Sequence, residues 1–220
     1  MTSTILATYD TVEQAQRAVQ DLTDSGFNRS DIGLALHDKY NAYDRLGTDD
    51  DVSGGEGASF GATIGGVLGA VVGLGAIIIP GIGPIVAAGP LAAALGALTG
   101  AAVGATTGAV TGGITASLLD MGVSEEDAHY YAESVRRGAA LVSVTAHEND
   151  RERATSIMQS HNPIDIDSRV AQWKARGWEG FDPMADPYTA EPLAEDNGVD
   201  EYDPNEEYPR TSVREYPMTR

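Results

Sequence analysis

Histidines and carboxylates are the side chains with which this sequence could perform acid–base or metal chemistry. The chain has four histidines and 33 Asp and Glu residues, but no cysteine. His37 and His147 end two expected strands that run antiparallel, so they lie at opposite ends of a sheet and cannot share a metal ion. His129 and His161 are single polar positions on expected helices. Because a zinc site needs at least three converging protein ligands, we expect no metal site.

Catalytic patterns of hydroxyls and carboxylates are not expected either. Asp165 and Asp167 share one side of an expected short strand, where they face solvent. We expect no Ser–His–Asp arrangement and no nucleophile elbow between a strand and a helix. The absence of cysteine excludes thiolate, disulfide and zinc–thiolate chemistry. The sequence therefore predicts a protein that is not an enzyme and that binds no cofactor.

Glycine-rich phosphate loops are a further chemical possibility, because 26 of the 220 residues are glycine. A dinucleotide-binding loop follows a strand, opens one helix and is followed by an acidic residue about 20 positions later. Here the glycines repeat along whole expected segments and follow an acidic linker, and no Gly-Lys-Ser/Thr occurs. We therefore reject a nucleotide site.

The formal net charge of −19 limits the partners of the chain. Phosphate backbones repel so acidic a protein, and no run of Lys or Arg provides a local exception, so we expect no nucleic acid. Contact with an anionic membrane would have to be hydrophobic.

A stretch without any charged side chain, residues 57–119, dominates the sequence. Two sets of five glycines recur in it at intervals of four residues. The first set is Gly57, Gly61, Gly65, Gly69 and Gly73, and the second is Gly96, Gly100, Gly104, Gly108 and Gly112. Pro80, Gly81, Gly83 and Pro84 form a turn between the sets, and Pro90 can open the second helix. The pattern predicts a glycine-zipper α-helical hairpin in which each set lines one helix face.

Close helix packing is the reason we infer for these glycines. Each glycine costs about 1 kcal/mol relative to alanine in an exposed helix, whereas a glycine face lets two backbones approach closely. Residues 58–79 would rise roughly 33 Å as a helix, close to the thickness of the hydrocarbon core. Residues 92–117 are less apolar, and Glu56 and Asp120 flank the stretch.

Two placements of the hairpin therefore stay open. Both of its ends join one domain, so a membrane hairpin would have to be two-pass or re-entrant, with the domain in the cytoplasm. Alternatively the hairpin is soluble and buries its apolar face in the protein or in a homo-oligomer.

The flanking segments alternate between strand and helix patterns. Strands are expected at about 3–9, 32–36, 139–146 and 164–166. Helices are expected after Thr11, which with Gln14 forms a capping box, after Ser124 with Asp127, and after Asn149. Gly26 and Gly138 stop two of them. The order predicts an α+β fold, a ferredoxin-like βαβ(insert)αβαβ sandwich in which strands two and three are antiparallel neighbours.

Four regions follow from these patterns. Residues 1–38 and 120–168 form the discontinuous ferredoxin-like domain, 39–56 an acidic linker, and 57–119 the hairpin insertion. Residues 169–220 form a disordered acidic tail rich in Tyr and Pro. Trp173, Trp178 and Phe181 are its large apolar anchors, either against the domain or at a bilayer interface.

Three stretches carry a resemblance to a known family. They are TVEQAQRAVQDLTDSGFNRSDIGL, PGIGPIVAAGPLAAAL and LLDMGVSEEDAHYYAESVRRGAALVSVTA, and together they lie within about residues 3–167. They resemble the bacterial general stress protein 17M-like, YflT-type domain family. The resemblance implies a heat- or stress-induced protein and brings no catalytic residues.

The sequence thus predicts a non-enzymatic stress-response protein that associates with the membrane through its hairpin and forms a homo-oligomer, with membrane lipid as a further partner. The alternative is a soluble cytoplasmic regulatory module that binds a partner or an unknown small ligand and uses its hairpin for self-assembly.

Overall fold

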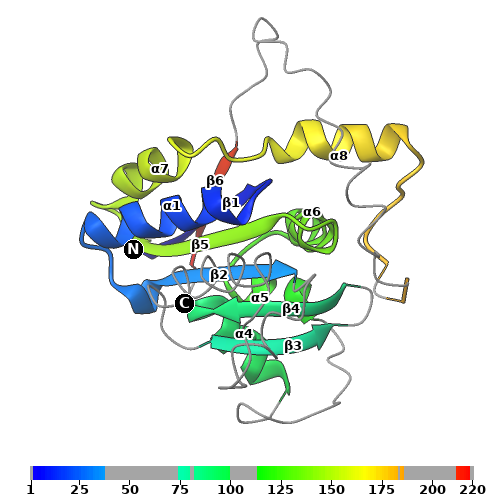
Figure 1. The fold of residues 1–220 in the computed structure, drawn as a ribbon, viewed down its shortest axis with the longest axis horizontal. Helices are drawn as coiled ribbons and strands as arrows, with labels where there is room; N and C mark the ends of the chain where they lie inside the picture. The colour runs from blue at the N-terminus through cyan, green and yellow to red at the C-terminus, as the bar shows by residue number, and fades with distance from the viewer. Residues whose placement is uncertain are drawn as a thin grey trace, which may run out of the picture.

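The computed structural model describes residues 2–37, 74–79, 82–99, 113–182, 184–185 and 212–218. They form an α+β fold around a six-stranded antiparallel sheet of order β3-β4-β2-β5-β1-β6 (Figure 1). The strands are β1 (Thr2–Tyr9), β2 (Ile32–His37), β3 (Leu74–Ile79), β4 (Gly83–Ala88), β5 (Ala140–His147) and β6 (Val213–Pro217). The helices are α1 (Val12–Asp24), the 3-10 turn η1 (Arg29–Asp31), α4 (Gly89–Thr99), α5 (Gly113–Asp120), α6 (Glu125–Arg136), α7 (Arg151–Gln159) and α8 (Ile166–Ala175).

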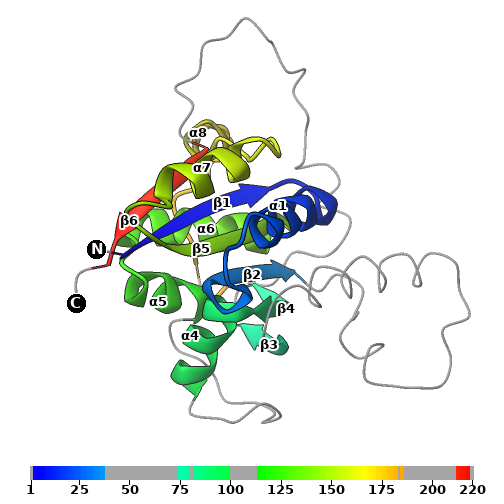
Figure 2. The same cartoon turned by 90° about the vertical axis from the view of Figure 1, so that its left-hand side faces the viewer.

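Alternate residues of each strand face two separate hydrophobic cores. Ile5 and Ala7 face α1 and α7, whereas Leu6 faces α4, α5 and α6. Because successive side chains of a strand point to opposite faces, both faces of the central strands must be apolar and covered. The molecule is therefore layered, with the sheet between a pair of helices and a group of three (Figures 1 and 2).

Local sequence signals set the ends of α1 and α6. The Thr11 hydroxyl accepts from the Gln14 N–H at 3.3 Å, and the Gln14 side chain accepts from the Thr11 N–H at 3.1 Å, which completes the expected capping box. The Ser124 hydroxyl accepts from the Asp127 N–H in the same way. Gly26 and Gly138 follow the two helices with φ of 90° and 95°, the left-handed conformation that suits glycine.

The expected neighbourhood of the second and third strands is confirmed. β2 pairs antiparallel with β5, with Ile32 opposite Val144 and Ala35 opposite Leu141. The long insertion leaves after β2, and its strand β4 pairs with the other side of β2, with Leu34 opposite Ala88. The insertion therefore extends the sheet beside β2, the strand after which it leaves the domain.

The prediction of a purely helical hairpin is wrong where the structure describes it. Residues 74–79, expected to end the first helix, form β3, and Gly83 and Pro84, expected in a helical turn, begin β4. The β-branched residues Ile77, Ile78 and Ile79 favour a strand, and β2 offers β4 an edge on which to pair. Pro84 is tolerated because β4 pairs with β2 only from Ile85 onward. Pro80 and Gly81 lie outside the described residues.

The predicted start of the second helix of the hairpin is confirmed. α4 begins at Gly89, so Pro90 occupies the first turn, as expected. α5 ends the insertion at Asp120, close to the predicted boundary.

The expected fourth strand at 164–166 is also wrong. Asp165 caps a helix instead: its Oδ1 accepts from the N–H groups of Asp167 at 3.0 Å and Ser168 at 3.2 Å. Ile166 is therefore the first residue of α8. Ile164 keeps a single contact with the sheet, in which its N–H donates to the Thr8 carbonyl at 2.8 Å.

Two parts of the tail predicted to be disordered, 169–220, are ordered. Most of α8 lies in it, and β6 pairs antiparallel with β1, with Ser3 opposite Pro217 and Ala7 opposite Val213. These segments are short, so the average composition of the tail did not indicate them. Each carries a large side chain, Trp173 or Tyr216, that is buried against the rest of the fold. Residues 183, 186–211, 219 and 220 lie outside the described residues.

Substitution of Gly33 tests how closely the insertion packs on the sheet. A Cβ at Gly33 would lie 2.3 Å from Ser143 Oγ and 3.2 Å from the Leu91 backbone nitrogen of α4. Overpacking of this kind costs about 1–3 kcal/mol, so Gly33→Ala should lower the free energy of unfolding by that amount in denaturant titrations.

Ser143→Ala provides the matched control, because the Ser143 hydroxyl is buried without a hydrogen-bond partner among the described residues. Alone it should leave stability unchanged or raise it, and combined with Gly33→Ala it should recover only part of the loss, since the α4 backbone still obstructs. Full recovery would contradict close packing of α4.

Candidate functional site

The glycine-rich insertion was the predicted functional element, and the structure describes its base. Of the two registers, only Gly96 lies among the described residues, within α4. The others, Gly57, Gly61, Gly65, Gly69, Gly73, Gly100, Gly104, Gly108 and Gly112, lie outside them. The zipper itself therefore stays a prediction.

The base of the insertion is part of the core. Ile82, Ile85, Leu91, Leu95 and Ile114 are buried against the sheet and α6. His37, at the end of β2, places its Nε2 3.0 Å from the Ile82 carbonyl oxygen and so joins β2 to the start of β4. Removal of the insertion would expose the part of this sheet face that α4 and α5 cover, whereas α6 would remain in place.

Both glycine registers connect to the same corner of the molecule. Leu74, directly after the first register, pairs with Ala88, and α4 begins at the next residue. α4 has 11 residues, roughly 16 Å, and leads into the second register. β3, β4, α4 and α5 lie together at one end of the sheet (Figure 2). The two registers are therefore rooted within one helix length of each other.

The insertion also carried the membrane prediction. The last part of the predicted first span, 74–79, is strand β3. Among the residues that the structure describes, no helix combines the length and apolar character needed to cross a bilayer.

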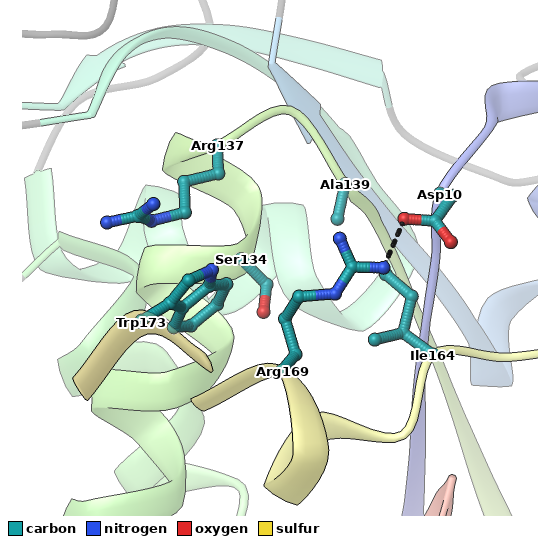
Figure 3. A pocket seen from close by; sticks show the side chains of 7 residues that line it. All are labelled: Asp10, Ser134, Arg137, Ala139, Ile164, Arg169 and Trp173. Carbon is teal, nitrogen blue, oxygen red and sulfur yellow. Dashed lines mark hydrogen bonds and ion pairs between the residues drawn. The ribbon is translucent and has the colours of Figure 1, made fainter. Parts of the chain in front are cut away.

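A small pocket on the opposite part of the molecule gathers side chains from three elements (Figure 3). Asp10 follows β1, Ser134 and Arg137 lie near the end of α6, and Arg169 and Trp173 lie on α8. Arg169 donates from Nη2 to Asp10 Oδ1 at 2.8 Å. Ala139 and Ile164 complete the lining. The pocket therefore marks where α8 docks on the sheet and on α6.

Charges beside the pocket are paired at the end of α6. Glu133 is fully buried and accepts from Arg137 Nε at 2.6 Å and from Arg136 Nη1 at 3.2 Å. The Arg137 guanidinium also lies 4.7 Å from the centre of the Trp173 ring, a cation–π contact. Two arginines near the carboxyl end of a helix also complement its dipole. The cluster therefore fixes Trp173, and with it α8, against α6.

The chemistry available in the pocket is limited. Its free volume of about 10 Å³ admits about one water molecule. The Ser134 hydroxyl donates to the Tyr130 carbonyl at 3.0 Å, a bond within its own helix. An organic substrate does not fit without movement of these side chains, so we assign the pocket to docking of α8.

His37 and His147 lie apart, as expected, whereas His161 lies beyond the end of α7 and not on a helix. In the register of β2 on β5, His37 and His147 fall at opposite ends of the pair. His161 follows α7 and contacts Asp21 at 2.9 Å, and the His129 ring lies 6.2 Å from that of Phe181. Within the described ranges no three His, Cys, Asp or Glu side chains converge on a common point. Ser59, in a Gly-x-Ser-x-Gly spacing from Gly57 to Gly61, lies outside these ranges.

A polar cluster, which we call the β6 clamp, joins the C-terminal strand to α6 and α8. Arg214 of β6 pairs with Asp127 and Asp167, and the Tyr216 hydroxyl donates to Asp127 Oδ2 at 2.9 Å. Tyr131 Oη lies 3.4 Å from Tyr216 Oη. Burial raises the pKa of Tyr216 to about 12 and raises that of Tyr131 well above its usual range. For Arg214, burial lowers the pKa but the bond to Asp167 and the nearby Asp127 charge outweigh it, so the pKa rises.

Sequence reasoning found some members of these sites and missed others. Of the two placements left open for Trp173, Trp178 and Phe181, the structure shows contact with the domain, since Trp173 packs with Tyr130 and Ile166, and Phe181 packs against the α6 side of the core. The pairing of Glu133 with Arg137 could have been predicted, because the two residues are four positions apart on an expected helix. The Asp10–Arg169 pair could not, since the two residues are distant in sequence.

Comparisons with known proteins give no match: no protein-family model, no curated protein and no solved structure matches the chain. Its function therefore has to be inferred from its own residues, and the resemblance to the YflT-type family stays a prediction.

Trp173→Ala tests the docking of α8. The side chain is buried against Arg137, Tyr130 and Trp178, and removal of a buried tryptophan costs about 3–5 kcal/mol. We expect a loss near the lower limit, about 3 kcal/mol, measured by circular dichroism in denaturant. Leu119→Ala, at a side chain on α5 that is 43% exposed, should change little.

Alkaline pH should weaken the β6 clamp. Tyr131 and Tyr216 stay neutral in the fold but ionise near pH 10 when unfolded. A raised folded pKa means that their stabilisation is complete below about pH 10 and is lost as the pH rises above it, in the case of Tyr216 toward its folded pKa of about 12. Tyr216→Phe should therefore reduce the slope of stability against pH in this window by up to about 1.4 kcal/mol per pH unit. An unchanged slope would contradict the shift.

Proposed function

We propose that this chain is a non-enzymatic stress-response protein that assembles through its glycine-rich insertion. The observation that carries the proposal is the common root of the two glycine registers: one joins β3 beside Ala88, and the other begins at Gly96 within α4, which starts at Gly89. Segments that begin so near each other can pack their glycine faces together, within one chain or between copies. The stress role rests on the resemblance to the YflT-type family.

The α/β body, which is the part of the fold outside the insertion, supports a ferredoxin-like interpretation. The strands β2, β5, β1 and β6 are neighbours in that order and all antiparallel, and α1 and α7 share one face. In this interpretation β6 takes the place that the sequence gave to residues 164–166. Such folds serve many functions, so the interpretation describes a scaffold and not an activity.

The bilayer is the second candidate partner. The observation in its favour is the complete absence of charge from 57 to 119 in a chain whose net charge is −19. Residues 57–73 and 100–112 are too short for two helical spans of about 20 residues each, so this candidate takes a re-entrant or surface-bound form. The α/β body would then face the cytoplasm.

Replacement of four register glycines tests assembly through the insertion. Gly65, Gly69, Gly100 and Gly104 changed together to leucine should reduce the oligomer mass measured by light scattering, because leucine side chains keep the backbones apart. Ala62, Ala70, Ala101 and Ala105 changed to leucine add three carbons per site, against four for glycine, on another face and should keep the mass. Equal masses for both variants and the unmodified chain would overturn the zipper proposal.

Cell fractionation distinguishes the two candidate partners. If lipid contact through the apolar insertion dominates, the protein should stay with the membrane pellet after a carbonate wash, since that wash removes electrostatically bound proteins. Recovery in the supernatant as a uniform oligomer would instead favour self-assembly without lipid.

A further inference from the structure

The C-terminal strand, β6, pairs along the outer edge of β1 and is held there by both backbone and side-chain contacts. Five residue pairs, from Ser3–Pro217 to Ala7–Val213, join β6 to β1, and the Met218 N–H donates to the Thr2 carbonyl at 3.1 Å. Figure 2 shows β6 at this edge, beside β1 and under α7. Without β6, five strands would remain in continuous order, with β1 at the edge.

Side chains on both faces of β6 form ion pairs or hydrogen bonds with charged residues of the helices around it. On one face, Arg214 pairs with Asp127 and Asp167, and Tyr216 donates to Asp127 at 2.9 Å. On the other face, Glu215 pairs with Arg151 of α7. Backbone pairing combined with side-chain contacts on alternate faces is the pattern of β-strand addition. The edge therefore selects an extended segment with Arg, Glu and Tyr in succession.

The receiving surface is held in place by the body itself. The Ser124 hydroxyl donates to Asp127 Oδ2 at 2.8 Å at the start of α6, and Arg151 also pairs with Glu148 at 3.3 Å. Gly122 has a φ of 89°, and a Cβ there would lie 3.0 Å from the Pro217 carbonyl oxygen. The backbone of the body is thus shaped to admit the end of the strand.

We propose that the β1 edge is a strand-acceptor site and that it binds the C-terminal strand of a second copy of this chain. The segment known to fit the site is the chain's own, and every copy carries one. Residues 186–211 separate β6 from the body and can extend roughly 85 Å, which is enough to reach a neighbour. Exchange conserves every contact of β6, which makes it an inexpensive route to a dimer.

This interface is independent of the glycine registers. In the sheet order, β3 of the insertion and β6 lie at opposite edges. A copy can therefore exchange β6 whether or not its insertion assembles, and the two interfaces together would link copies through both edges of the sheet.

Engineered cysteines test the exchange in the full chain, which has no native cysteine. Ser3 and Pro217 are opposite each other, and Pro217 has no N–H, so they form a non-hydrogen-bonded pair with closely spaced side chains. Ser3→Cys and Pro217→Cys are placed in separate copies that differ in mass by a tag. The copies are mixed at high concentration with oxidised glutathione. We expect a disulfide-linked heterodimer, seen on non-reducing gels.

The control mixture pairs Pro217→Cys with Leu119→Cys, an exposed position on α5, and should give several-fold less heterodimer. A chain that carries both Ser3→Cys and Pro217→Cys should form a cross-link within one copy in dilute solution, which shows that the strand still docks. If this double variant closes but the mixture yields no more heterodimer than the control, exchange between copies is overturned. Failure of the double variant to close would overturn the acceptor site itself. The four-leucine register variant should exchange like the unmodified chain, which separates this result from the failure of the zipper.

Discussion

The pairing of β5 with β1 and β2 is the interaction on which the rest of the structure depends. β5 comes from the second half of the sequence, yet it lies between two strands of the first 37 residues, with eight pairs to β1 and four to β2. This arrangement places the ends of the insertion on one body and leaves one edge of β1 and one of β2 free for further strands. β4 takes the second of these edges and β6 the first.

Two additions therefore extend one central unit, and they differ in chemistry. The β4 side is apolar: it contributes Ile85 and Leu91 to the core, and a Cβ at Gly33 would lie 3.2 Å from the Leu91 backbone nitrogen of α4. The β6 side is polar and rests on ion pairs and on the Tyr131–Tyr216 contact. A surface rich in ion pairs can release and rebind a strand more readily than a dry core can release a helix, because charged groups regain water when they separate.

The charge of the chain is distributed in keeping with this division. Residues 57–119 contain no charged side chain, whereas the described ion pairs gather around α6, α7, α8 and β6. A buried charge needs a partner of opposite charge, and the fully buried Glu133 carboxylate pairs with two arginines. Among the described residues, Arg137, Arg169 and Arg214 thus help to hold the C-terminal third of this acidic protein on the rest of the fold.

Much of the body could be predicted from sequence, because its signals are local. Thr11 with Gln14 and Ser124 with Asp127 start helices, Gly26 and Gly138 end them, and apolar alternation marks β1, β2 and β5. These signals act within a few residues, so they need no knowledge of the fold.

Tertiary structure alone decided the remaining elements. The apolar run at 74–88 suits a strand or a helix, and the free edge of β2 decided for strands. Residues 213–217 bury too little to be ordered alone, and they form β6 because β1, Asp127 and Arg151 receive them. In each case the partner that supplies the hydrogen bonds lies far away in the sequence, so no local pattern contains it.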